Sequence, residues 1–192
     1  MVLLHGSGHD GMSLVEPWKT LAEKIGIVLV APDSANSQAW DPSKDGPDFL
    51  PAIIEAVRAK CNIDGKRIYM FGHSAGATFA LYISMFESEY FAATAVRAGV
   101  IRSRGLPRNR FCKTPHPDRN MGWVLRPIFS VAEVCGARDA LTRHGIPIEL
   151  KELRRHDHNY YAICNTLNLQ IWEFLSGKGF LPIPSTSNTC SN

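Results

Sequence analysis

The stretch Arg67-Ile-Tyr-Met-Phe-Gly-His-Ser-Ala-Gly76 decides the fold of this chain. It begins as a short apolar run typical of a strand and ends in Gly-x-Ser-x-Gly, and a small-residue segment typical of a helix, 75–86, continues from it. This order of strand, motif and helix presents a nucleophilic serine on a tight turn. Glycine is needed at Gly72 and Gly76 because a side chain there would collide with the strand or the helix. The stretch predicts Ser74 as a nucleophile, against the alternative of a glycine-rich turn with an idle serine.

Around this stretch, short apolar runs alternate with amphipathic segments, which predicts an α/β fold with a mostly parallel sheet and helices on both faces. The expected strands are 2–4, 26–31, 67–71, 91–100 and 146–153, and the expected helices are 13–25, 49–61, 75–86, 131–144 and one that ends near 175. The continuously apolar run 26–31 is typical of a strand covered on both faces. One domain is expected over 1–177, followed by a flexible tail over 178–192.

Composition places the chain among ordinary globular proteins. Its 192 residues are 45% hydrophobic and 20% charged, enough for one domain with a real core. No apolar window is long enough for a membrane span, and no signal peptide is visible. The five cysteines show no CxxC spacing, which argues for reduced thiols rather than a metal site or a disulfide framework (Cys61, Cys112, Cys135, Cys164 and Cys190). A cytoplasmic location is therefore expected.

The segment 101–126 is anomalous. It holds six Arg and one Lys against a single Asp, while the rest of the chain has a net charge of −3. Such a block can bind nucleic acid or an anionic surface. It lacks interleaved aromatic residues and a helical period, so no nucleic-acid partner is expected. Binding of phospholipid or of a polymer through this block would weaken with salt.

Two backbone N–H groups are candidates for an oxyanion hole. His5-Gly6 follows the first expected strand, where the loop of such a fold offers one donor, and the residue after the nucleophile offers the other. The candidates are the amides of Ser7 and Ala75. The alternative is that His5-Gly6 is only a tight turn.

The general base should be a histidine that follows the last strand. His156 and His158 both qualify by position. His144 ends an expected helix and His116 lies in the Arg-rich block, and the three earlier histidines are interpreted as structural (His5, His9 and His73). No third ligand of fitting spacing accompanies His156 and His158, so no metal is expected there.

Several motifs together resemble the esterase branch of the α/β-hydrolases, which includes polyhydroxybutyrate depolymerase-like, feruloyl esterase-like and S-formylglutathione hydrolase-like proteins. The motifs are Leu4-His-Gly-Ser-Gly8, Asn62-Ile-Asp, Arg67-Ile-Tyr, Gly72-His-Ser-Ala-Gly76 and Asp157-His-Asn-Tyr-Tyr161, and the resemblance covers about 2–100 and 127–175.

The resemblance implies a serine esterase that acts through an acyl-enzyme on a small-molecule or polymeric ester and needs no cofactor. In these relatives the base is followed by one residue and then an aromatic, as in His158-Asn159-Tyr160, which favours His158 and keeps His156 in reserve. The oligomeric state and the identity of the substrate are not indicated.

The chain departs from this family where the triad acid is expected. The relatives carry Trp-Val-Gly-x-x-Asp-Pro after the penultimate strand, whereas this chain has Trp123-Val-Leu-Arg-Pro127, with Arg126 at the expected position. The preceding 116–122 cannot form a buried parallel strand, so a disrupted penultimate strand is expected. The chain also starts inside the first matched strand, so the N-terminal strands are expected to be missing. Possible substitutes for the acid are Asp118, which is nearest, Glu133, Asp139 and Asp157.

A slip of the reading frame would explain this departure. Back-translated and read one base later, 116–127 can give Ile-x-Ile-x-Ile-Trp-Val-Gly-x-x-Asp-Pro, which combines a strand period with an aspartate in place of Arg126. The nucleotide sequence tests this hypothesis. The competing hypothesis for the protein is a catalytically inactive α/β-hydrolase fold, either a defective gene product or a binding protein.

Overall fold

A computed structural model of the chain describes residues 1–46, 48–86, 90–99, 120–125, 131–143, 148–152 and 158–178. Five strands within these residues form one sheet in the order β1-β2-β3-β4-β5, and every neighbouring pair is parallel. The strands are β1 (Val2–Leu4), β2 (Tyr69–His73), β3 (Ala93–Arg97), β4 (Asn120–Leu125) and β5 (Ile148–Glu152). All five strands therefore present their carboxyl ends at the same edge of the sheet.

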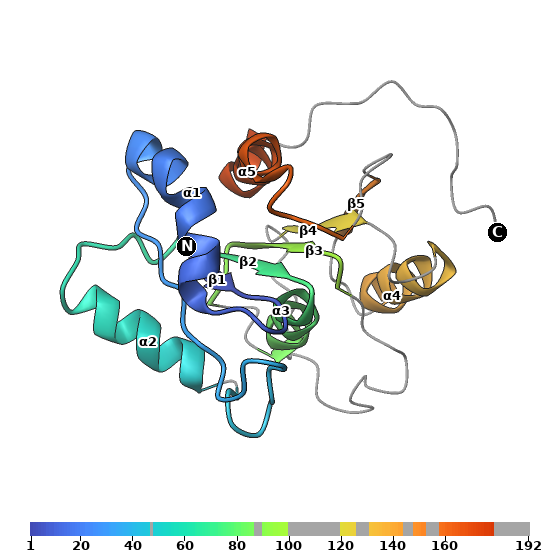
Figure 1. The fold of residues 1–192 in the computed structure, drawn as a ribbon, viewed down its shortest axis with the longest axis horizontal. Helices are drawn as coiled ribbons and strands as arrows, with labels where there is room; N and C mark the ends of the chain where they lie inside the picture. Colours follow the sequence, from blue (N-terminus) through green and yellow to red (C-terminus); the bar gives the residue numbers. More distant parts are fainter. Residues whose placement is uncertain are drawn as a thin grey trace.

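Helices cover both faces of the sheet (Figure 1). They are α1 (Gly11–Ile25), α2 (Phe49–Arg58), α3 (Ala75–Phe86), α4 (Val131–Arg143) and α5 (Cys164–Glu173), and α5 continues into the short π-helical turn η2 (Phe174–Lys178). Buried side chains of α1 and α5 pack in one cluster and those of α2, α3 and α4 in another. The α/β architecture predicted from the alternation of segments is confirmed.

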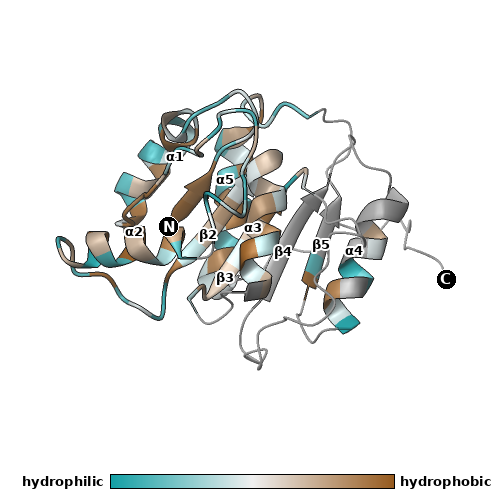
Figure 2. Cartoon of the chain, turned by 90° about the horizontal axis from the view of Figure 1, so that it is seen from below, coloured by the Kyte–Doolittle hydropathy of each residue, from teal (hydrophilic) through white to brown (hydrophobic). Residues whose placement is uncertain are grey.

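Strand side chains divide between these two clusters with a period of two. In β2, Tyr69 and Phe71 face α1 and α5, while Met70 faces α3. β1, β2 and β3 are largely hydrophobic, and hydrophobic residues also lie on the sides of α1, α3 and α5 that face them (Figure 2). Both faces of the central strands are thus closed to water, as parallel sheets require.

Helix α1 begins two residues before the predicted start. Asp10 caps it, because its carboxylate accepts a hydrogen bond of 2.8 Å from the amide of Ser13. The helix ends at Gly26, whose φ of 71° lies in the left-handed region. These two caps define the ends of α1. This helix covers the face of the sheet on which the candidate site residues lie.

The prediction of a doubly covered strand at 26–31 is wrong. This run pairs with the sheet through Val30, which exchanges backbone hydrogen bonds of 2.8 and 2.9 Å with Leu3 and Met1 beside β1. The side chain of Val28 is 39% exposed. The segment lies at the edge of the sheet, and an apolar run does not distinguish an edge position from a central one.

The predicted disruption of the penultimate strand is wrong for 120–125. Asn120 pairs with Ala93 of β3, and Met121 pairs with Ile148 of β5, so β4 is bonded on both sides. Backbone hydrogen bonds do not depend on apolar side chains, and the residues that argued most against a strand, Pro117 and Asp118, precede β4 in the sequence. The predicted loss of N-terminal strands stays a prediction.

The expectation of five reduced thiols also needs correction, because Cys135 in α4 is disulfide-bonded. Spacing rules detect local cysteine motifs such as CxxC and do not detect a bridge formed without one. Cys61 and Cys164 are free. The cytoplasmic location drew partly on reduced thiols and stays a prediction.

Several predictions fall outside the described residues. They concern most of the Arg-rich segment 101–126, the frame hypothesis built on it, and the tail after Lys178, as well as His116, Asp118, Arg126, His144, His156 and Asp157. Among the helices that the structure describes, none is long and apolar enough to cross a membrane.

Candidate active site

Ser74 is the single residue between a strand and a helix. β2 ends at His73 and α3 begins at Ala75. The φ of Ser74 is 56°, in the left-handed region that a residue with a side chain rarely adopts. Its amide donates a hydrogen bond of 2.9 Å to the carbonyl of Arg97, and its carbonyl accepts one of 3.1 Å from Thr78. Strained backbone of this kind is concentrated at functional sites.

The glycines of the motif are needed for close packing. A Cβ on Gly72 would overlap the carbonyl oxygen of Gly76 and lie 2.8 Å from the Cα of Ala77. A Cβ on Gly76 would overlap the carbonyl of Leu4 and lie 2.6 Å from that of His5. The turn therefore tolerates no side chain at either position, which agrees with the reasoning from sequence.

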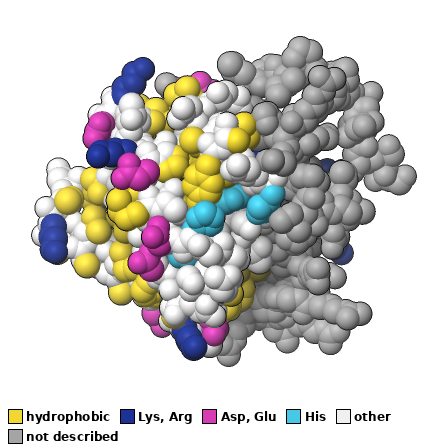
Figure 3. Space-filling view, in the orientation of Figure 1, with side chains coloured by type: hydrophobic (Ala, Val, Ile, Leu, Met, Phe, Trp, Pro, Cys, Tyr) yellow, Lys and Arg dark blue, Asp and Glu magenta, His cyan; other side chains and the backbone are white. Residues whose placement is uncertain are grey.

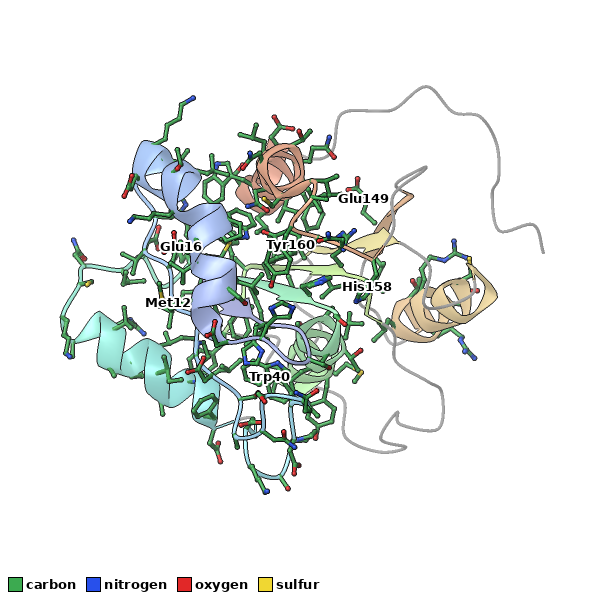
Figure 4. The ribbon with its side chains drawn as sticks, viewed as in Figure 1. Met12, Glu16, Trp40, Glu149, His158 and Tyr160 are labelled. Carbon is green, nitrogen blue, oxygen red and sulfur yellow. The ribbon has the colours of Figure 1, made fainter. Side chains whose placement is uncertain are left out.

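The structure brings His158 to Ser74. The Nε2 atom of His158 lies 3.0 Å from the Oγ of Ser74, although the two residues are 84 positions apart. With the ring proton assigned to Nδ1, Nε2 accepts the hydroxyl proton of Ser74. His158 lies beside Tyr160 on the segment that leads into α5 (Figure 4). These are the two residues predicted as nucleophile and base.

Arg97 at the end of β3 contacts both of these residues. Its side chain is fully buried, and its Nη1 donates a hydrogen bond of 2.7 Å to the carbonyl of His158. Its own carbonyl accepts the bond from the amide of Ser74. No motif in the sequence pointed to Arg97 as a site residue. The signal was present, because Arg97 is the only charged residue in the otherwise apolar run 91–100, which was predicted as a strand.

His73 packs beneath the candidate base. Its ring centroid lies 5.0 Å from that of His158 and 5.4 Å from that of Tyr160. Burial first, and then the positive charge of Arg97 and the nearby His158, lower the pKa of His73 from 6.5 to about 3. His73 is therefore uncharged near neutral pH and adds no positive charge beside His158.

Tyr160 closes the site from the side of α5. It is buried, and its hydroxyl donates a hydrogen bond of 2.7 Å to Asn168. Burial raises the pKa of Tyr160 above its usual range. Histidine side chains gather at one place on the surface here, next to hydrophobic ones (Figure 3).

The loop after β1 lies against the nucleophile. A Cβ added to Gly6 would lie 3.3 Å from the Cβ of Ser74. The indole of Trp40 donates a hydrogen bond of 2.9 Å to the carbonyl of His5, and the amide of Ser34 donates one of 3.1 Å to the His5 ring. His5 is buried, as its structural interpretation expects.

The two predicted oxyanion donors are available. Within the described residues, the amides of Ser7 and Ala75 donate no hydrogen bond to the protein. Ala75 is the first residue of α3, where N–H groups have no partner in the helix. Their role as an oxyanion hole stays a prediction.

The triad acid is not among the contacts described. Asp139 is exposed on α4, where it forms an ion pair of 2.7 Å with Arg138. Asp118, Asp157 and Arg126 lie outside the described residues, and the side chain of Glu133 is also not described. In the described part of the chain, no group of three His, Cys, Asp or Glu residues could hold a metal ion.

The known proteins that are similar to this chain are named as esterases or hydrolases. No protein-family model matches the chain. It is 31% identical over 104 residues to the bifunctional acetylxylan esterase/xylanase XynS20E of Neocallimastix patriciarum, a match over 52% of this chain and 15% of that protein. It is 31% identical over 88 residues to the oxidized polyvinyl alcohol hydrolase of Sphingopyxis sp. (strain 113P3), a match over 46% of this chain and 22% of that protein. The matched part is thus less than a quarter of each relative's length.

Among solved structures, esterase PE8 is similar with a TM-score of 0.68 and 19% identity, over 90% of each chain. At this level of identity the likeness concerns the fold, which here extends over nearly the whole of both chains.

Proposed function

Because the chain has the α/β-hydrolase fold found in esterases and carboxylesterases, we propose that it is a serine hydrolase that cleaves carboxylic esters through an acyl-enzyme. The observation that carries the proposal is the distance of 3.0 Å between Ser74 Oγ and His158 Nε2. Ser74 holds this position on a strained turn between a strand and a helix.

The residues perform the reaction in two steps. His158 removes the proton of Ser74 as its oxygen attacks the ester carbonyl, and the amides of Ser7 and Ala75 hold the developing oxyanion. The alcohol then leaves with the proton from His158. In the second step His158 removes a proton from water, and the water oxygen attacks the acyl carbonyl. The bond to Ser74 then breaks, the carboxylic acid leaves, and His158 returns the proton to Ser74 Oγ.

The names of the two relatives support a proposal for the substrate class. One acts, by its name, on acetylated xylan and the other on oxidized polyvinyl alcohol. We extend the proposal to acyl groups on a small alcohol or a hydroxylated polymer, with polyhydroxybutyrate-like polyesters as a further candidate from the resemblance in sequence.

Hydrolysis of phenyl acetate and of acetylated xylan tests the proposal. Ser74→Ala should reduce kcat by several orders of magnitude, since the nucleophile is lost and only the residual contribution of the oxyanion hole and substrate binding remains. Ser43→Ala is the matched control, because Ser43 is an exposed loop serine bonded only within its own turn. If folded wild-type protein hydrolyses neither ester, the alternative of an inactive fold or binding protein stands.

We also propose that the rate is impaired by the residue at position 126. Arg126 follows β4 directly in the sequence, where the resemblance places the carboxylate that orients the base. Replacement of this carboxylate lowers kcat by about 10⁴-fold in a well-studied serine protease. Arg126→Asp should therefore raise kcat by roughly 10²- to 10⁴-fold. An unchanged kcat would assign the acid to another residue, with Asp118, Glu133, Asp139 and Asp157 as candidates, and the nucleotide sequence of 101–126 would show whether the frame is shifted.

A further inference from the structure

Arg97 connects the two halves of the site. Its carbonyl accepts the Ser74 amide at 2.9 Å, and its Nη1 donates to the His158 carbonyl at 2.7 Å. Ser74 and His158 belong to parts of the chain that are 84 residues apart. One residue at the end of β3 therefore holds the backbone of both.

The sheet aims the Arg97 side chain at the site. Arg97 pairs in register with His73 of β2, and residues in register on neighbouring parallel strands point to the same face. That face is the one on which Phe71, His73 and Tyr160 pack against each other. The guanidinium group of Arg97 therefore reaches the carbonyl of His158 from this face of the sheet.

A buried arginine is a poor choice for stability alone. Taking a charge out of water costs free energy, and apolar residues of similar volume often serve a core as well or better. Arg97 is fully buried in a strand whose other members are Ala, Thr and Val. The cost of this charge indicates that Arg97 does something other than fill space.

Arg97 contacts the backbone that carries the His158 imidazole. The hydrogen bond fixes the carbonyl, and so the backbone from which the imidazole extends toward Ser74. A displacement of about 1 Å in a reacting group can lower a rate by about 10²-fold. We propose that Arg97 is a positioning residue that sets the distance between Ser74 and His158, an inference that rests on the serine hydrolase function proposed above.

The test compares fluorophosphonate labelling of the whole chain in the wild type, Arg97→Met and Arg97→Lys. Methionine fills similar space without donating, so Arg97→Met should label about 10²-fold more slowly while it keeps the wild-type circular dichroism spectrum. Lysine is one bond shorter and its ammonium cannot reach the same carbonyl without movement, so Arg97→Lys should be slower than wild type by about 10-fold. Arg58→Met is the matched control, because Arg58 is an exposed residue of α2 paired with Glu55, and its rate should not change.

The pH profile separates positioning from general destabilisation. Removal of a buried cation near His158 favours the imidazolium, so the acid limb of the labelling rate should move to higher pH in Arg97→Met. Loss of folded protein alone would lower the amplitude of labelling and leave this limb in place. The limb should not move in Arg58→Met.

The outcomes are distinguishable. If folded wild type is not labelled, the proposed function fails and this inference fails with it. If wild type is labelled and Arg97→Met has the wild-type rate and pH profile, only the positioning role is overturned. If Arg97→Met does not fold, Arg97→Lys decides, and a wild-type labelling rate in that variant overturns the proposal.

Discussion

Gly76→Ala tests the packing that makes Ser74 reactive. The new Cβ would overlap the carbonyl of Leu4 and lie 2.6 Å from that of His5, whereas real Cβ contacts essentially never fall below 3.0 Å. Both atoms belong to the backbone at the end of β1, which is hydrogen-bonded to β2 and cannot turn aside as a side chain can. The start of α3 must therefore move by several tenths of an ångström to about 1 Å. Overpacking of a core typically costs about 1–3 kcal/mol, and this rigid site should lie near the upper end.

Denaturant unfolding and fluorophosphonate labelling measure the two consequences. We expect Gly76→Ala to lose about 3 kcal/mol of unfolding free energy and about 10²-fold in labelling rate, because α3 carries the oxyanion donor and follows Ser74 directly. Gly136→Ala is the control. Gly136 lies within α4 with open space around it, so alanine should stabilise the protein by about 0.5–1 kcal/mol. A Gly76→Ala protein with wild-type stability and labelling rate would refute the packing argument.

Two further predictions concern buried groups near the site. The pKa of His73 is lowered from 6.5 to about 3, so between these values the unfolded chain binds a proton that the native protein does not. Stability is then full above 6.5 and falls as the pH drops; between about pH 7.5 and about pH 5 the wild type should lose about 2 kcal/mol more unfolding free energy than His73→Phe, measured by urea titration. Equal losses in both proteins would show that His73 titrates normally. Trp40→Phe keeps the stacking on Phe79, at 5.0 Å, but leaves the buried carbonyl of His5 without its donor. It should cost about 1–3 kcal/mol in the same titration, and a neutral result would mean that another group replaces the indole N–H.

The fold could be predicted from the sequence where it depends on local residue patterns. The glycines of the Ser74 turn and the alternation of segments predicted the parallel sheet and its helices. The run 26–31 was misjudged because hydrophobicity does not reveal whether a strand has one neighbour or two. β4 was misjudged because its hydrogen bonds come from the backbone of β3 and β5, which the side chains of 120–125 do not report.

The sequence was sufficient to predict the reacting residues of the site, but not the residues that position them. Ser74 and His158 were identified from motifs, and the structure brings them together. The contacts of Arg97 with His158 and of Trp40 with His5 join distant segments, so neither leaves a local pattern. A charge in an apolar strand was the one available sign of Arg97.

Mass spectrometry after fluorophosphonate labelling tests whether Ser74 is a nucleophile activated by His158. We expect one adduct on wild-type protein, mapped to the peptide that carries Ser74, none on Ser74→Ala, and much slower labelling of His158→Ala. An adduct on Ser74→Ala, or no adduct on folded wild-type protein, would contradict this role.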